Sequence, residues 1–236
     1  MHHTTRRRPP SYRIALATSV LLLVAAQLFV IVDNARGATR DYGSGPTPIP
    51  TSAAVVSTAD YTSRSQWMIF GDSITLGGYA YKTLAAQRPT WRLAVNAQSS
   101  RGTTATVTAA INTPDLPAHV IMAVGSNDVP NPPVMAAQIK RLRDALEPRG
   151  ITVYWGTVHV VRTRGTAAQQ LADQRNSGWV NAQIQAGCTA PCRVIDWGSF
   201  LAGYPSYRIP AYLRDGVHLS DQGKAPWSAL ISGAIR

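Results

Sequence analysis

The stretch "MIFGDSITLGG", residues 68–78, decides how this chain folds. Three apolar residues run directly into Gly71, Asp72 and Ser73, and a glycine-containing segment follows. The apolar run indicates a buried strand, and Gly-Asp-Ser at its end is typical of a tight turn that caps a helix. Such a turn places Ser73 at the carboxyl end of a strand. The rest of the chain decides whether this serine is only a turn residue or a nucleophile.

From residue 65 onward, short apolar runs alternate with helical patterns. We expect strands at 67–70, 92–95, 119–124, 151–158 and 193–196, and helices at 75–87, 104–111, 134–147, 166–186 and 221–235. This alternation predicts an α/β fold, a three-layer doubly wound parallel sheet with helices on both faces. In such folds the functional site lies at the carboxyl ends of the strands, where Ser73 falls.

The N-terminal part of the chain carries the localisation signals. Residues 14–32, "IALATSVLLLVAAQLFVIV", contain no charge and are long enough to span a bilayer. Arginines precede them, so we expect a single-pass signal-anchor with residues 1–13 in the cytoplasm. A signal peptide cleaved near "NARGA" is the alternative, and the protein would then be secreted. Residues 33–64 predict a flexible tether, and residues 65–236 form the exported domain on the outer face of the cytoplasmic membrane.

Charge and cysteine usage exclude two kinds of partner. The formal net charge is +11, but the basic residues of the domain form no run, so no nucleic-acid partner is expected. That balance suits an acidic or anionic-polymer environment. Cys188 and Cys192, in "CTAPC", are the only cysteines, and an exported compartment permits a disulfide between them. Two thiols without a histidine at ligand spacing cannot complete a zinc site, so no metal is expected.

Four polar segments carry the candidate chemistry. Three follow expected strands and the fourth precedes the last helix: Gly71-Asp72-Ser73, "NAQSSRGTT" at 96–104, "GSND" at 125–128 and "RDGVHLSDQG" at 214–223. A serine nucleophile needs a base and a carboxylate that orients this base. His218 and Asp215, three positions apart, supply both from one loop. The developing oxyanion needs N–H donors, which the backbone of Ser73 and the side chain of Asn127 would provide.

These segments resemble the SGNH, or GDSL-type, hydrolase family over about residues 66–235. The resemblance implies that Ser73 is the nucleophile, Asn127 the oxyanion asparagine, and Asp215 with His218 the D-x-x-H pair. It also implies a flavodoxin-like sheet and no cofactor. Asp72 of the first motif is interpreted as a turn and capping residue.

One motif departs from the family pattern. The second motif of the family usually contains a glycine whose backbone N–H is an oxyanion donor. That position falls here on Ser100 or Arg101, and Gly102 is displaced by one or two residues. A backbone N–H survives substitution, so Ser100 and Gly102 are alternative donors.

Three further residues are candidates for the substrate pocket. His159 follows the fourth expected strand at its carboxyl end, where it would line a pocket for the acyl group or a sugar. Trp197 and Tyr207, in the segment before Asp215, are either packing residues or substrate walls. His119 opens a strand at the end away from the site and is expected to be structural.

Within the family, residues 194–220 are most similar to SGNH domains of bacterial cell-envelope acyl-transfer proteins, including peptidoglycan O-acetyltransferases. We therefore expect a serine esterase that forms an acyl-serine intermediate on Ser73 and acts on acyl esters of envelope glycans or lipids. An O-acyltransferase to an envelope carbohydrate is one alternative, and a non-catalytic glycan-binding or assembly subunit is another. Because the chain has one candidate span, a membrane acyltransferase partner would be a separate protein.

Overall fold

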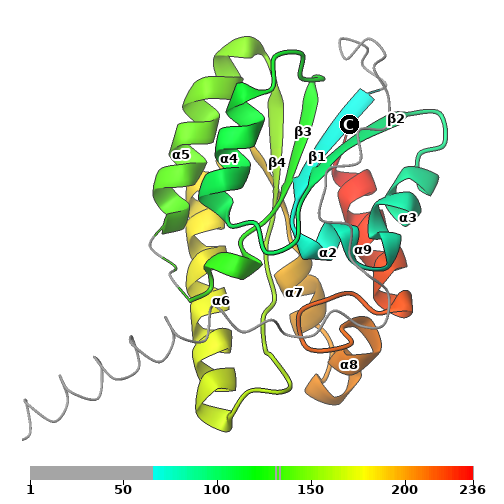
Figure 1. The fold of residues 1–236 in the computed structure, drawn as a ribbon, viewed down its shortest axis with the longest axis vertical. Coiled ribbons are helices and arrows are strands. Elements are labelled where there is room, and N and C mark those ends of the chain that lie inside the picture. The colour runs from blue at the N-terminus through cyan, green and yellow to red at the C-terminus, as the bar shows by residue number, and fades with distance from the viewer. Residues whose placement is uncertain (1–65, 131, 133, 236) are drawn as a thin grey trace, which may run out of the picture. The chain divides into compact units, whose positions relative to one another are not determined.

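In the computed structural model, residues 66–130, 132 and 134–235 are described, and they contain a five-stranded parallel sheet (Figure 1). The strands are β1 (Gln66–Gly71), β2 (Arg92–Ala97), β3 (His119–Ala123), β4 (Thr152–Gly156) and β5 (Arg193–Ile195). Their order is β2-β1-β3-β4-β5, and every neighbouring pair is parallel. The predicted parallel α/β sheet is therefore confirmed. The chain reverses its direction of travel across the sheet between β1 and β3, and ligands of such sheets bind beside this point, at the carboxyl ends of the strands.

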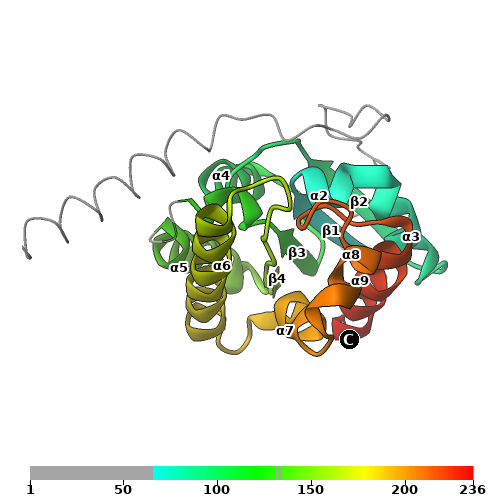
Figure 2. The same cartoon turned by 90° about the horizontal axis from the view of Figure 1, so that it is seen from below.

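Both faces of the sheet are covered, so β1 is apolar along its length. Met68 and Phe70 belong to one buried cluster, whereas Trp67 and Ile69 belong to the other. Helices close the two faces on opposite sides: α4 (Thr103–Asn112), α5 (Val134–Leu146) and α6 (Ala167–Gly187) on the first, and α3 (Ala80–Ala86), α7 (Trp197–Ala202) and α9 (Asp221–Ala234) on the second (Figure 2). Burial on both faces explains why the strand reads as a continuous apolar run.

The predicted helix at 75–87 is interrupted in the structure. Helix α2 spans only Ser73–Leu76, a 3₁₀ turn, η1, follows at Gly77–Tyr79, and α3 then begins at Ala80. Gly78 has a φ of 55° and Tyr79 a φ of 60°, both in the left-handed region. A right-handed helix cannot continue through two such residues, so the prediction of one helix was wrong.

The segment between β5 and α9 contains helices that the sequence pattern did not predict. Helix α7 is capped by Asp196, whose side chain accepts a hydrogen bond from Ser199 N. A 3₁₀ turn, η4 (Ser206–Arg208), and the single turn α8 (Ile209–Tyr212) follow. Elements of four to six residues are too short to show a clear helical period. Two more 3₁₀ turns, η2 (Ser126–Asp128) and η3 (Glu147–Arg149), lie after β3 and before β4.

The predicted anchor at 14–32, with residues 1–13 and the tether at 33–64, lies outside the described residues. In the part of the chain that the structure describes, no helix has the length and apolar character that crossing a bilayer requires.

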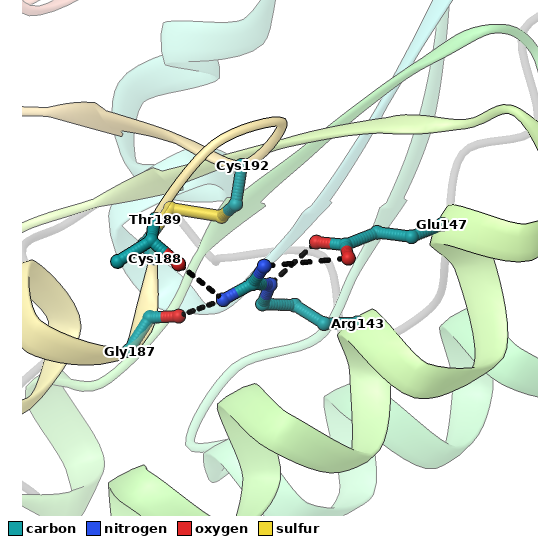
Figure 3. The surroundings of a disulfide bond; sticks show 6 residues. All are labelled: Arg143, Glu147, Gly187, Cys188, Thr189 and Cys192. Atoms are coloured by element: carbon teal, nitrogen blue, oxygen red, sulfur yellow. Dashed lines mark hydrogen bonds and ion pairs between the residues drawn. A yellow bond between two sulfur atoms is a disulfide. The ribbon is translucent and has the colours of Figure 1, made fainter.

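A disulfide joins Cys188 and Cys192 where α6 ends (Figure 3). Arg143 of α5 reaches the same turn, donating to the Gly187 carbonyl oxygen at 2.5 Å and to Thr189 Oγ1 at 2.9 Å, and it also pairs with Glu147. The guanidinium satisfies a carbonyl that the helix end leaves free and places positive charge at the negative end of the helix dipole. Together these contacts fix the turn that leads into β5.

We expect replacement of both cysteines by serine to lower the free energy of unfolding by only about 1–2 kcal/mol, because so short a loop restricts the unfolded chain little. Urea denaturation of the wild type and the double variant measures this difference. Iodoacetamide should label the native wild type only after a reductant is added. Immediate alkylation of both thiols in the unreduced native protein would contradict the disulfide.

Candidate active site

The end of β1 positions the candidate nucleophile. Asp72 is the N-cap of α2, and its Oδ1 accepts a hydrogen bond from Ile74 N at 2.8 Å. Gly71 packs so closely against the helix that a Cβ at this position would lie 2.0 Å from Thr75 Oγ1. The turn therefore requires a glycine, and it places Ser73 as the first residue of α2, at the carboxyl edge of the sheet.

Ser73, His218 and Asp215 form a hydrogen-bonded chain. Ser73 Oγ lies 2.9 Å from His218 Nε2, and His218 Nδ1 lies 2.7 Å from Asp215 Oδ2. Asp215 Oδ1 accepts hydrogen bonds from the backbone N–H groups of Val217 and His218, at 3.0 and 2.8 Å. The structure thus brings together a serine and a histidine that are 145 positions apart in the sequence.

Asp215 is ionised at neutral pH. Burial raises its pKa, but the hydrogen bonds from the His218 side chain and backbone and the charge of His218 outweigh burial and lower the pKa to about 2. The carboxylate accepts a hydrogen bond from His218 Nδ1–H. In the tautomer that this bond selects, the Nε2 lone pair faces Ser73. This arrangement allows His218 to take the proton of the Ser73 hydroxyl as it attacks.

Residues 161–163, after β4, hold the loop that carries Asp215 and His218 in place. We call them the bracing segment, and the loop around Asp215 and His218 the catalytic loop. Val161 N donates to Gly216 O, and Thr163 N donates to Asp215 O, both at 3.0 Å. Gly216 has a φ of +84°, and a Cβ there would lie 1.8 Å from Val161 O, so no side chain fits. The sequence reasoning missed Gly216, and its place inside the D-x-x-H motif was the available signal.

The bracing segment is itself fixed to helix α6. Arg162 Nη2 lies 2.6 Å from Asp173 Oδ1, and Arg162 N also donates to the Asp173 carboxylate, at 3.2 Å. Asp173 is buried, so the pair is partly shielded from solvent. The position of the catalytic loop therefore depends on α6 through this pair.

Asp72 also joins the first polar segment to the third. Its Oδ2 accepts hydrogen bonds from Ser126 Oγ at 2.6 Å and from Asn127 Nδ2 at 3.2 Å. The carboxyl is fully buried, and burial raises its pKa against the opposing effect of the hydrogen bonds from Ser126 and Ile74 N. The sequence interpretation of Asp72 as a capping residue covers only Oδ1, and neither the role of Oδ2 nor that of Ser126 was predicted.

The Asn127 amide is already engaged in this structure. Besides Asp72, its Nδ2 donates to Arg101 O at 3.3 Å. Because the C=O and N–H of a trans peptide point in opposite directions, the Gly102 N–H points away from Asn127. An oxyanion held jointly by Asn127 and Gly102 would therefore require rotation of the Arg101–Gly102 peptide. Arg101 N donates to Gln98 O at 3.3 Å and is not free.

Backbone conformation distinguishes Ser100 from Gly102. Ser100 has a φ of 60°, in the left-handed region, and Gly102 has φ −78° and ψ 167°, which any residue can adopt. A Cβ at Gly102 would approach only Asp128 Oδ1, at 3.3 Å. The observed conformation therefore does not require glycine at 102. Rotation of the preceding peptide would take φ to positive values, which glycine tolerates best.

The predicted pocket residues differ in their exposure. His159 is half-buried three positions after β4, and burial lowers its pKa, which keeps the imidazole neutral. Trp197 is only 4% exposed and stacks on Phe200 with ring centroids 5.2 Å apart, so the structure supports the packing alternative. Tyr207, on η4, is 75% exposed. Within residues 66–130, 132 and 134–235, no group of three or more His, Cys, Asp or Glu residues could hold a metal ion.

The motifs and the fold have counterparts in known proteins. The model of the GDSL-like lipase/acylhydrolase family matches residues 69–225, and no curated protein matches the chain. A GDSL-like lipase from Bacteroides thetaiotaomicron is 18% identical with a TM-score of 0.58, and the alignment covers 73% of this chain and 88% of the other. The acetyl xylan esterase AlAXEase is 18% identical with a TM-score of 0.56, and the alignment covers 72% of this chain and 100% of the other. The C-terminal catalytic domain of peptidoglycan O-acetyltransferase A from Streptococcus pneumoniae is 20% identical with a TM-score of 0.50, and the alignment covers 72% of this chain and 90% of the other. At these identities the likeness establishes a shared fold.

We expect Gly216→Ala to displace the catalytic loop, because the new Cβ would overlap Val161 O and the φ is positive. The free energy of unfolding should fall by about 2–4 kcal/mol. The rate of hydrolysis of 4-nitrophenyl acetate should also fall steeply. Gly178→Ala is the matched control. A Cβ at Gly178, in α6, meets nothing within 4 Å. This variant should therefore keep its activity, and its free energy of unfolding should rise by up to about 1 kcal/mol. Full activity in Gly216→Ala would contradict the assigned packing.

Substitution of Gly102 tests the oxyanion loop. If the Arg101–Gly102 peptide rotates during the reaction, Gly102→Ala should lower kcat by roughly a hundred- to a thousandfold, the usual effect of losing one oxyanion donor. The melting temperature should change little, because alanine fits the observed conformation. Ser100→Gly, which keeps the N–H and suits the left-handed φ, is the control and should stay active. Normal turnover by Gly102→Ala would assign the donor to Ser100 N.

Proposed function

The chain belongs to the GDSL-like lipase/acylhydrolase family, and we propose that it is a serine esterase that forms an acyl-enzyme on Ser73. Family membership makes the protein a hydrolase that acts on ester bonds. The observation that carries the proposal is the hydrogen-bonded chain from Ser73 Oγ through His218 to the ionised Asp215. A hydroxyl becomes an effective nucleophile when a correctly oriented base lies within hydrogen-bond reach.

In the first half of the reaction, Ser73 Oγ attacks the ester carbonyl carbon while its proton passes to His218 Nε2. Negative charge develops on the carbonyl oxygen, and the Ser73 N–H, the Asn127 amide and one N–H of the second loop are the proposed donors to it. Collapse of the tetrahedral intermediate breaks the bond from the carbonyl carbon to the alcohol oxygen. The alcohol leaves with the proton that His218 returns, and the acyl group stays on Ser73.

In the second half, a water molecule gives a proton to His218 and attacks the acyl carbon. The bond from the acyl carbon to Ser73 Oγ then breaks, His218 returns the proton to Oγ, and the carboxylic acid leaves. Transfer to a carbohydrate hydroxyl is the second candidate function, because it uses the same acyl-enzyme with another acceptor. The similar structures include both an acetyl xylan esterase and the catalytic domain of an O-acetyltransferase. Added acceptor sugars distinguish the two reactions, since only transfer yields an acylated sugar.

The proposed setting is the outer face of the cytoplasmic membrane, with acyl esters of envelope glycans or lipids as substrates. The uncharged segment at 14–32, preceded by arginines, supports a single-pass anchor. The disulfide between Cys188 and Cys192 supports an oxidising compartment outside the cytoplasm. A separate membrane acyltransferase is the proposed partner for the transfer reaction. A glycan-binding subunit without activity is disfavoured by the intact Ser73–His218–Asp215 arrangement.

We expect Ser73→Ala to abolish hydrolysis of 4-nitrophenyl acetate and labelling by a fluorophosphonate, because the hydroxyl is the atom that both reactions modify. The melting temperature should stay nearly unchanged, since one hydroxyl contributes little packing. His218→Ala should be comparably inactive, because residues of such a unit act together.

Asn127→Ala and Asp215→Asn complete the series. Each should retain folded structure by circular dichroism, and Asn127→Ala should lower kcat roughly a hundred- to a thousandfold. Ester turnover at the wild-type level in Ser73→Ala would disprove the mechanism.

A further inference from the structure

Three arginines beside the catalytic loop are exposed and belong to no ion pair among the described residues. Arg164 follows the bracing segment, Arg208 ends η4, and Arg214 directly precedes Asp215. The ion pairs of the described residues involve other basic side chains: Lys140, Arg143, Arg162, His218 and Lys224. The positive charge of these three arginines therefore faces solvent.

Backbone contacts bring two of these arginines together. Val161 pairs with Gly216 and Thr163 pairs with Asp215, so the two segments run in opposite directions. Arg164 follows Thr163, and Arg214 precedes Asp215. Both arginines therefore lie just beyond the same end of the paired stretch. Figure 2 looks onto the carboxyl edge of the sheet and shows the two segments meeting near α2.

Arg208 is connected to the same region through the single turn of α8. Leu213 N donates to Ile209 O at 2.9 Å, which closes this turn, and Arg208 and Arg214 precede and follow it in the chain. Arg208 is also close enough to Tyr212 for its charge to act on the pKa of that phenol. We call Arg164, Arg208 and Arg214 the arginine surface.

Three acidic groups of this region already have partners. Asp221 pairs with Lys224, whose hydrogen bond lowers the pKa of Asp221 together with the charge of Arg214. Asp173 pairs with Arg162, and Asp215 with His218. Like charges that gather without counter-charges repel one another and favour an anionic partner. A guanidinium also binds carboxylate and phosphate groups through paired hydrogen bonds, which gives orientation as well as attraction.

We propose that the arginine surface binds an anionic group that the substrate carries near its ester. This proposal rests on the proposed esterase function and narrows its substrate class to acyl esters of an anionic polymer. Carboxylate and phosphate share the required chemistry. The anionic group would dock beside Asp215 and orient the ester carbonyl toward Ser73.

The test compares matched acetate esters. The rate constant kcat/KM is measured for 4-acetoxybenzoate, 4-acetoxyphenyl phosphate and the neutral methyl 4-acetoxybenzoate, and each anionic-to-neutral ratio is compared among variants, so that intrinsic reactivity cancels. Arg164→Gln, Arg208→Gln and Arg214→Gln should each lower the ratio roughly two- to fivefold. Arg214→Lys, which keeps the charge, should restore part of it. The ester with the larger loss identifies carboxylate or phosphate as the preferred group.

Arg92→Gln is the charge-matched control. Arg92 is exposed at the start of β2, so it lies at the amino ends of the strands, whereas the arginine surface lies near their carboxyl ends. It takes part in no ion pair among the described residues. Its ratio should equal that of the wild type. Salt should lower the wild-type ratio, because the screening length falls from about 10 Å at 0.1 M to about 3 Å at 1 M.

The outcomes separate the two proposals. Turnover of the neutral ester with equal ratios in the wild type and the three glutamine variants would overturn the arginine surface and leave the esterase standing. If the wild type cleaves no ester, the esterase fails, and affinity electrophoresis tests the surface alone. The wild type should then be retarded by polygalacturonate and not by dextran. Retardation by polygalacturonate should be weaker in the three glutamine variants and unchanged in Arg92→Gln. Equal retardation of all variants would overturn the surface.

Discussion

The buried carboxylate of Asp72 is the interaction on which the arrangement of the site depends. One oxygen caps α2 and thereby orients Ser73, while the other receives hydrogen bonds from Ser126 and Asn127 of the segment after β3. A fully buried carboxyl is tolerated only when its oxygens are hydrogen-bonded. The same group therefore sets the direction of Ser73, the candidate nucleophile, and the position of the Asn127 amide, and a shift in one would be transmitted to the other.

Close backbone approach is the second constraint on the site. Gly71 lets the turn pack against Thr75, and Gly216 lets the catalytic loop lie directly on the carbonyl of Val161. Hydrogen bonds between backbone groups hold a loop more rigidly than contacts between long side chains, because fewer rotatable bonds are ordered. His218 therefore reaches Ser73 from a loop that is held by the sheet edge and, through Arg162 and Asp173, by α6.

Electrostatic organisation differs between the interior and the surface of the site. Inside, Asp215 is stabilised by His218, and Asp173 pairs with Arg162. Outside, the arginine surface forms no ion pair among the described residues, and Asp221, on which the charge of Arg214 acts, pairs with Lys224. Internal pairing keeps the catalytic geometry independent of a bound anion, whereas the solvent-facing arginines leave charge available for a substrate.

The sequence by itself determined the parallel α/β sheet and the residues that carry the candidate chemistry. Strands buried on both faces are visible as apolar runs, and Gly-Asp-Ser and D-x-x-H are local patterns. Only the tertiary structure decided that Gly216 must lack a side chain, that Asp72 bonds to Ser126, and that Trp197 packs in the core. Each of these depends on contacts between segments far apart in the chain. The short helices α7 and α8 were missed because four to six residues cannot show a helical period, and the orientation of the Arg101–Gly102 peptide depends on packing that no local pattern encodes.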